Sequence, residues 1–309
     1  MANIVTDGID LTGQFSPIFW GFVVSLVLGG ITILQAYIYF YRFNDRLEIR
    51  TIAATMLALD VVSSALVAQS IYYYLLPHFG SLEPLSSVTP ELSAECLIST
   101  IITFISQMYF VYQLYILHHL KRINIMFTIL IGVGACLALA GGIACVITMY
   151  IFHHGVLSNR NDMFAIFFGI AKAFGAFTDI LATVCMTVFL KSSITGVIET
   201  KKLLNNLIQF VIQRGALVTL IQTLLLITFF AAPNSLSWFA FHVNVTKLYA
   251  NTFFAMLNGR DRREKRRMTA RNDSYNLHFT TPDHSRGELN SQSSHSVINV
   301  TKSVIVADV

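Results

Sequence analysis

Charged residues are scarce in this chain, and their scarcity is the first constraint on its fold. Asp, Glu, Lys and Arg make up 12% of the 309 residues, whereas a soluble domain usually carries about twice that share. Hydrophobic residues make up 54%, and the mean hydropathy is +0.61. They lie in runs long enough to cross a bilayer, which takes about 20 residues at a rise of 1.5 Å each. The composition therefore excludes an ordinary soluble domain and predicts an all-α, polytopic membrane protein.

Cysteine is rare as well, with four residues in the whole chain. The spacing contains no CxxC pair and no Cys/His zinc pattern, which excludes a zinc finger and a secreted disulfide framework. A bridge between Cys96 and Cys145 stays open, because both are predicted near the outer surface, but we favour free, buried thiols. Enzyme signatures are also missing, including GxSxG, HExxH, the Walker loop and the dinucleotide fingerprint. The sequence therefore predicts no enzyme, no cofactor and no metal.

Seven apolar runs are predicted to be transmembrane helices. Their approximate bounds are 15–41, 51–76, 93–117, 125–152, 163–190, 207–232 and 236–257. Residues 1–14 are short and slightly acidic, which does not fit a cleavable signal peptide. We therefore expect an extracellular segment at 1–14, a seven-helix bundle at 15–257, and a basic and disordered tail at 258–309.

The basic residues between the runs predict the orientation. Fourteen Lys and Arg residues follow runs one, three, five and seven, whereas one follows runs two, four and six. By the positive-inside rule, the N-terminus is outside and the C-terminus is in the cytosol. Orientation and anionic lipid account for this basic charge, so nucleic acid is not expected as a partner. The expected partners are the lipid bilayer, of the plasma membrane or an endomembrane, and cytosolic proteins that dock on the tail.

Four charged residues are predicted to lie deep in the membrane, namely Asp60, Lys172, Asp179 and Lys247. A charge at the bilayer centre costs about 2.5–3.5 kcal/mol on insertion scales, so each should face the bundle interior and most should be paired. Counted from the cytosolic helix ends, the two acids and Lys247 lie at one level, roughly 14–17 Å deep. Lys247 is therefore expected to pair with either acid. Lys172 lies two turns nearer the outside and needs another partner.

The last apolar run carries a polar stripe. Asn244, Lys247, Asn251 and Asn258 recur at spacings of three, four and seven, which places them on one helix face that should turn inward. The functional interpretation is an ion path, a counter-charge for a ligand, or a switch; the structural alternative is an ionic lock. The candidate buried polar site consists of Asp60, Lys172, Asp179, Asn244, Lys247 and Asn251.

Histidines and aromatic residues near the run ends receive a structural interpretation. Metal binding or pH sensing is one possibility for a group of outer residues, but we favour interfacial histidines. That group is His78, Glu83, Glu95, His153, His154 and His242. Tyrosines near the run ends and Trp238 are interpreted as belts at the membrane interface.

The segment from about 175 to 262 contains a set of short motifs. They are Asp179-Ile180, Leu190, Ser192, Thr200, Leu203-Leu204-Asn205, Leu207-Ile208, Gly215, Ile227-Thr228-Phe229, Pro233, Lys247-Leu248-Tyr249, Asn251 and Leu257-Asn258-Gly259-Arg260. With these motifs the chain resembles a fungal family of seven-span membrane proteins that carry a domain of unknown function, number 6534. The resemblance implies a seven-span bundle and no catalytic residues, because the family has no assigned activity.

The predicted topology is similar to that of G-protein-coupled receptors, although the motifs differ. The Asp-Arg-Tyr box is replaced by His118-His119-Leu120-Lys121-Arg122, and the last run has no Asn-Pro-x-x-Tyr box. Topology alone is an analogy. We place receptor-like sensing first, because the tail and the basic loops offer docking surfaces. Transport of an ion or proton through Asp60, Asp179 and Lys247 is the second hypothesis, and a structural membrane scaffold is the third.

Overall fold

The computed structural model describes residues 11–77, 88–120, 125–152, 162–192, 198–232 and 235–279. Within these ranges it contains seven α-helices and no strand, which confirms the all-α prediction. The helices are α1 (Leu11–Arg42), α2 (Leu47–Leu75), α3 (Pro90–Leu120), α4 (Ile125–Phe152), α5 (Asp162–Ser192), α6 (Ile198–Ala231) and α7 (Ser237–Phe279).

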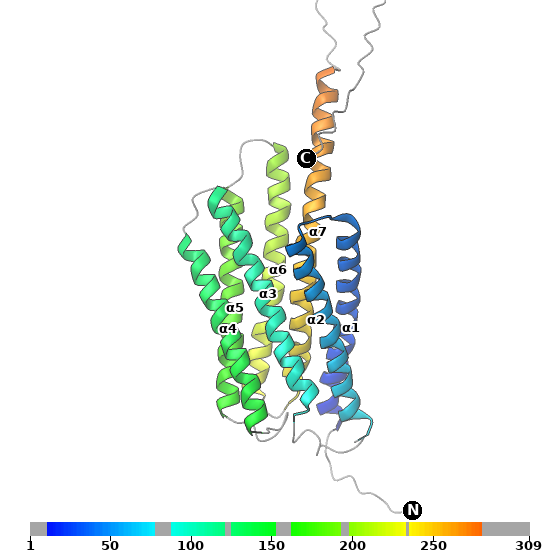
Figure 1. Ribbon diagram of the computed structural model, residues 1–309, viewed down its shortest axis with the longest axis vertical. Coiled ribbons are helices and arrows are strands. Elements are labelled where there is room, and N and C mark those ends of the chain that lie inside the picture. Colours follow the sequence, from blue (N-terminus) through cyan, green and yellow to red (C-terminus); the bar gives the residue numbers. More distant parts are fainter. Residues whose placement is uncertain are drawn as a thin grey trace, which may run out of the picture. The chain divides into compact units, whose positions relative to one another are not determined.

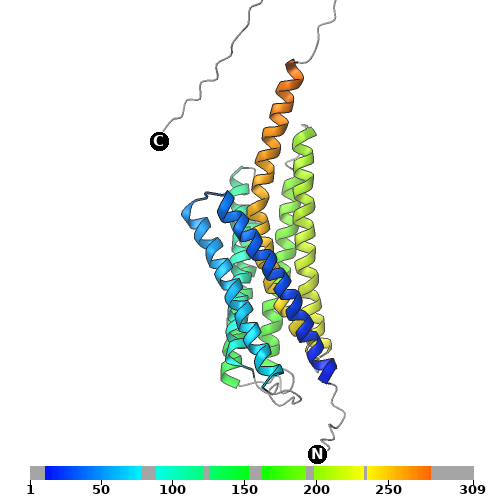
Figure 2. The same cartoon turned by 90° about the vertical axis from the view of Figure 1, so that its right-hand side faces the viewer.

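Successive helices run in opposite directions and form one bundle (Figure 1). The first residues of α1, α3, α5 and α7 consequently lie at one end of the bundle, and the view in Figure 2 shows the same alternation. The chain divides into two compact units, residues 1–266 and residues 267–309, and the bundle belongs to the first. Every predicted run corresponds to one helix of this bundle.

The surface of the bundle is apolar, and its interior combines an apolar core with buried polar and charged groups. Trp20 on α1, Ile151 on α4 and Val188 on α5 are each 62–63% exposed, and most other outward residues are also large hydrophobics. Lys247 and Glu95 are 0% exposed. A soluble protein buries apolar groups and rarely exposes large apolar patches, so this distribution fits a protein surrounded by lipid. The chain is therefore a membrane-embedded helical protein.

Five helices are long and apolar enough to cross a membrane, among the residues that the structure describes. These helices are α1 to α5. The apolar part of α6 that qualifies by composition is Gly215–Ala231, which is shorter. The sequence predicted that α7 would also be apolar enough to span, but it is not among the five. The reason is its composition, because polar residues such as His242, Asn244 and Lys247 lower its mean hydropathy. Its side chains from Leu236 to Leu257 are buried or half-buried among the other helices, which is where such residues are tolerated.

The last helix continues beyond the predicted end of the bundle. We expected a tail without helical structure from residue 258, whereas α7 extends to Phe279. The basic segment at 260–267 is therefore helical. Residues 280–309, which were also assigned to the tail, lie outside the described residues.

Small residues allow close helix contacts at two places. A Cβ atom on Gly21 of α1 would lie 2.6 Å from the Cα of Ala240 on α7, so this glycine is needed for the α1–α7 contact. On α4, a Cβ on Gly134 would meet Thr178 of α5, and one on Gly142 would meet Thr100 of α3. The predicted small-residue face of the fourth run thus packs against two helices.

Candidate functional site

The buried polar groups of the bundle converge on the first half of α7. Its side chains hydrogen-bond to α1, α2, α3, α5 and α6. Because its neighbours supply the lipid-facing surface, α7 carries polar residues that would be costly on an outer helix. The polar stripe predicted from the sequence therefore faces the bundle interior.

Lys247 and Asp60 form a buried ion pair between α7 and α2. The Nζ atom lies 2.9 Å from Oδ1 of Asp60, and it also donates to the Asp60 carbonyl and to Oγ of Ser64, both at 2.7 Å. An ammonium group has three N–H donors, so these contacts use all of them. The pairing that the sequence left open is therefore made with Asp60.

Asp179 lies on the opposite side of α7 and has a different partner. The hydroxyl of Tyr249 donates to Oδ2 of Asp179 and accepts a hydrogen bond from Nε2 of Gln222 on α6. Tyr249 follows Lys247 by two residues, which turns it by roughly 200° about the helix axis and advances it by about 3 Å. The two acids are therefore level with each other, as their depth predicted. The tyrosine was not among the predicted site residues.

Three asparagines of α7 join it to α1 in a regular ladder. The side-chain amides of Asn244, Asn251 and Asn258 donate to the carbonyl oxygens of residues 21, 28 and 35, at 3.0, 2.9 and 2.8 Å. Both series repeat every seven residues, so the two helices keep one register over three contacts. This spacing matches a left-handed helix pair, in which contacts recur every 3.5 residues.

Lys172 on α5 is not part of the Lys247 network. Its Nζ lies 5.6 Å from the centre of the Phe168 ring, and its side chain lines a cavity of ≈ 20 Å³ between α3, α4, α5 and α6. Gln107 and Gln222 line the same cavity, and their Oε1 atoms are buried without a hydrogen-bond partner in the part of the chain that is described. A cavity of this size holds about one water molecule.

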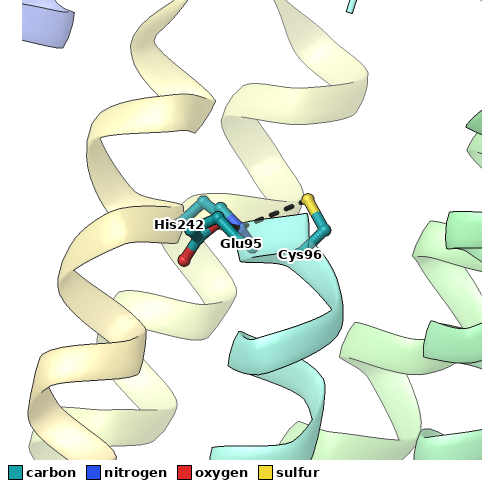
Figure 3. Close-up of side chains that lie close together, drawn as sticks. All are labelled: Glu95, Cys96 and His242. Carbon is teal, nitrogen blue, oxygen red and sulfur yellow. Dashed lines mark hydrogen bonds and ion pairs between the residues drawn. The ribbon is translucent and has the colours of Figure 1, made fainter. Parts of the chain in front are cut away.

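A third cluster joins α3 to α7 near the ends at which these helices begin. Nε2 of His242 lies 3.0 Å from Oε2 of Glu95 and 3.7 Å from Sγ of Cys96 (Figure 3). Ser63 on α2 donates to the other carboxylate oxygen at 3.2 Å. Two of the six outer residues considered above thus meet, and Cys96 joins them. The remaining four residues of that group, His78, Glu83, His153 and His154, lie outside the described residues.

An apolar pocket of ≈ 430 Å³ lies between α2, α3 and α7. This volume is within the range of small-molecule sites. Its polar lining comes from the first turns of α2, at Glu48, Thr51 and Thr55. The rest of the lining is Ile49, Ile52, Phe104, Ile105, Met108, Tyr109, Tyr112 and Phe253. No sequence motif identified this pocket, because its walls come from three helices and consist of ordinary apolar residues.

Two structural interpretations made from the sequence have different outcomes. All four cysteines are free, so Cys96 and Cys145 do not form a bridge. The interpretation of the aromatic residues as interface belts is wrong in part. Tyr74, Tyr109 and Trp238 are buried in the core. Sequence position near a run end gives the depth of a residue and not the direction in which its side chain points.

Residues 175–262 match a family described as a family of unknown function (DUF6534). The matched segment includes Asp179 and the polar part of α7, but it does not include the partners of α7 on α1, α2 and α3. No curated protein and no solved structure is significantly similar to the chain. The match supports the resemblance of the C-terminal part and assigns no activity to it.

Proposed function

We propose that this chain is a non-enzymatic seven-span membrane protein, with its N-terminus outside, that senses a small apolar molecule. The observation that carries the proposal is the ≈ 430 Å³ pocket between α2, α3 and α7. The helices α2 and α7, which line it, are also the two helices that the Lys247–Asp60 pair joins. A ligand in the pocket therefore contacts the elements whose relative position this ion pair holds.

The distances along the helices support this coupling. Phe253 lines the pocket six residues after Lys247, which is about 9 Å along α7, and Thr55 lines it five residues before Asp60. The lining is largely apolar, with one carboxylate at Glu48, so the preferred ligand is an apolar molecule with a hydrogen-bond donor or a positive group. Such a molecule partitions into the bilayer and enters between α2 and α3, where Ile52 and Tyr112 are exposed.

The proposed output is on the cytosolic side. The basic segment at the end of α7 and the tail that follows it offer a docking surface for cytosolic proteins. The membrane is the plasma membrane or an endomembrane. A ligand that shifts α7 relative to α2 changes the presentation of that surface. A ligand shifts this equilibrium only if it binds the two arrangements of α7 and α2 with different affinity.

Photolabelling of the full chain in nanodiscs tests the pocket. The probe is a long-chain fatty alcohol with a diazirine group, and the labelled peptides are mapped. We expect saturable labelling of residues 47–55 and 104–112, and its loss in Met108→Trp, which fills the pocket. Ile147→Trp on the exposed face of α4 is the matched control. Equal, non-saturable labelling of all lipid-facing helices would show that acyl chains alone occupy the groove, and would refute the proposal.

Two measurements separate sensing from the other hypotheses. Proximity labelling from residue 309 should change in Met108→Trp cells if the protein is a sensor. An ion or proton pathway predicts flux in proteoliposomes that disappears in Asp60→Asn without loss of folding.

The second candidate is a structural scaffold, which is favoured by the full use of the Lys247 donors. It predicts that all these variants change only the amount of folded protein.

A further inference from the structure

We propose that Glu95, Cys96 and His242 form a binding site for one divalent cation of the zinc class, held between α3 and α7. Each residue offers one ligand atom, and the three atoms lie within 4.8 Å of one another in the bundle interior (Figure 3). Oxygen, sulfur and imidazole nitrogen are the donors that Zn²⁺ uses in proteins. This inference does not depend on the apolar pocket.

The separations between the ligand atoms fit a metal ion. Bonds of about 2.0–2.2 Å to nitrogen and oxygen and about 2.3 Å to sulfur place neighbouring donors in a tetrahedral site roughly 3.3–3.6 Å apart. The observed distances from His242 Nε2 are 3.0 Å to Glu95 and 3.7 Å to Cys96. All three pairs of ligand atoms lie within 4.8 Å, so an ion fits where side-chain shifts bring the wider pairs to these separations. Three protein ligands leave a fourth position for a water or another small ligand.

Charge balance favours the cation in this place. A carboxylate and a thiolate together carry two negative charges, which a divalent ion neutralises, and a neutral assembly avoids the cost of an unpaired charge in the membrane.

The surroundings hold the three ligands in place. Ser63 donates to Oε1 of Glu95 and so leaves Oε2 facing His242. One helical turn further, Ser99 and Thr246 share a hydrogen bond of 2.6 Å that fixes α3 against α7. The rings of Phe168 and Trp238 lie 6.4 and 6.3 Å from the imidazole ring and close that side to water. Ligands positioned by hydrogen bonds and packing are the usual basis of a stable metal site.

Metal titration of the purified full chain in nanodiscs tests the proposal. With Zn²⁺ as the probe, we expect one ion per chain by calorimetry and by metal analysis after dialysis. With Co²⁺ as the probe, we expect a thiolate-to-cobalt charge-transfer band in the near ultraviolet. Cys96→Ser should abolish that band, and Glu95→Gln and His242→Gln should each weaken Zn²⁺ binding by more than about 100-fold, since outer-shell changes alone cost 10–100-fold.

Two further variants sharpen the test. Ser63→Ala should weaken binding by roughly 10–100-fold, because Ser63 orients a ligand without being one. Cys185→Ala removes a free, half-buried thiol on α5 and should leave both the stoichiometry and the cobalt band unchanged. The proposal is overturned if the wild type binds no Zn²⁺ at micromolar concentrations, or if the cobalt band persists in Cys96→Ser. Circular dichroism of each variant before metal addition shows whether it has folded.

Discussion

Lys247 on α7 and Asp60 on α2 form an ion pair in which neither side chain exposes more than 2% of its surface. Removing one partner of such a pair leaves an uncompensated charge in the bundle. We therefore expect Lys247→Met to lower the free energy of unfolding by about 3–5 kcal/mol. The measurement is unfolding of the purified protein in mixed micelles, followed by circular dichroism.

The double variant D60L/K247M provides the control for this prediction. It removes both charges together and should recover most of the lost stability, because no unpaired charge is left. K247M/D179N should not recover it, since Asp179 is bound to Tyr249 rather than to Lys247. Rescue by the Asp179 variant instead would contradict the pairing seen in the structure.

The depth of these charges could be predicted from the sequence, whereas their partners could not. Counting residues from the basic loops places Asp60, Asp179 and Lys247 at one level, and the contacts agree. The count gives a position along each helix axis but neither the rotation of the helix nor the identity of its neighbours. Tyr249 was missed for this reason, although it follows Lys247 by two residues. Cys96 was considered only for a bridge with Cys145, because depth does not show that its thiol lies beside His242.

The asparagine ladder between α7 and α1 should tolerate single substitutions. A hydrogen bond between membrane helices contributes about 0.6 kcal/mol on average, so Asn251→Ala should cost little in mixed-micelle unfolding. Asn244 and Asn258 each lie about 10 Å from Asn251 along the helix, which makes additive losses the expectation for the triple variant. Thr223→Ala is the control, because that exposed hydroxyl bonds only within α6. A triple variant as stable as this control would mean that the ladder contributes nothing.

Heptad spacing of these asparagines was visible in the sequence, but their acceptors were not. The acceptors are backbone carbonyls of Gly21, Leu28 and Gln35, and a carbonyl leaves no signature in a sequence. Among the three acceptor residues, only Gly21 matters by its residue type. Its missing side chain is what allows the two helices to approach each other.

Gly21 should therefore tolerate substitution less well than Gly29 or Gly30 of the same helix. A Cβ atom at this position would lie 2.6 Å from both Cα and Cβ of Ala240, so Gly21→Ala must push α1 away from α7 at a cost of about 1–3 kcal/mol. Gly30→Ala is the matched control on the same helix, since its Cβ would meet nothing within 4 Å. There the higher helix propensity of alanine should stabilise the protein slightly. Equal effects of the two variants on thermal unfolding would argue against the close α1–α7 contact.

The proposed seven-span topology predicts that the two ends of the chain lie on opposite sides of the membrane. Five helices, α1 to α5, qualify as spans by composition among the described residues. Under the proposal α7 crosses as well, because its side chains bond to four of these five helices, α1, α2, α3 and α5, and to α6. Epitope tags before residue 1 and after residue 309 in intact and permeabilised cells measure this directly. The C-terminal tag should need permeabilisation, as should a tag at residues 193–197, whereas the N-terminal tag and one at residue 160 should not. Two ends on the same side would require an even number of crossings, and either α6 or α7 would then have to leave the bilayer on the side from which it entered.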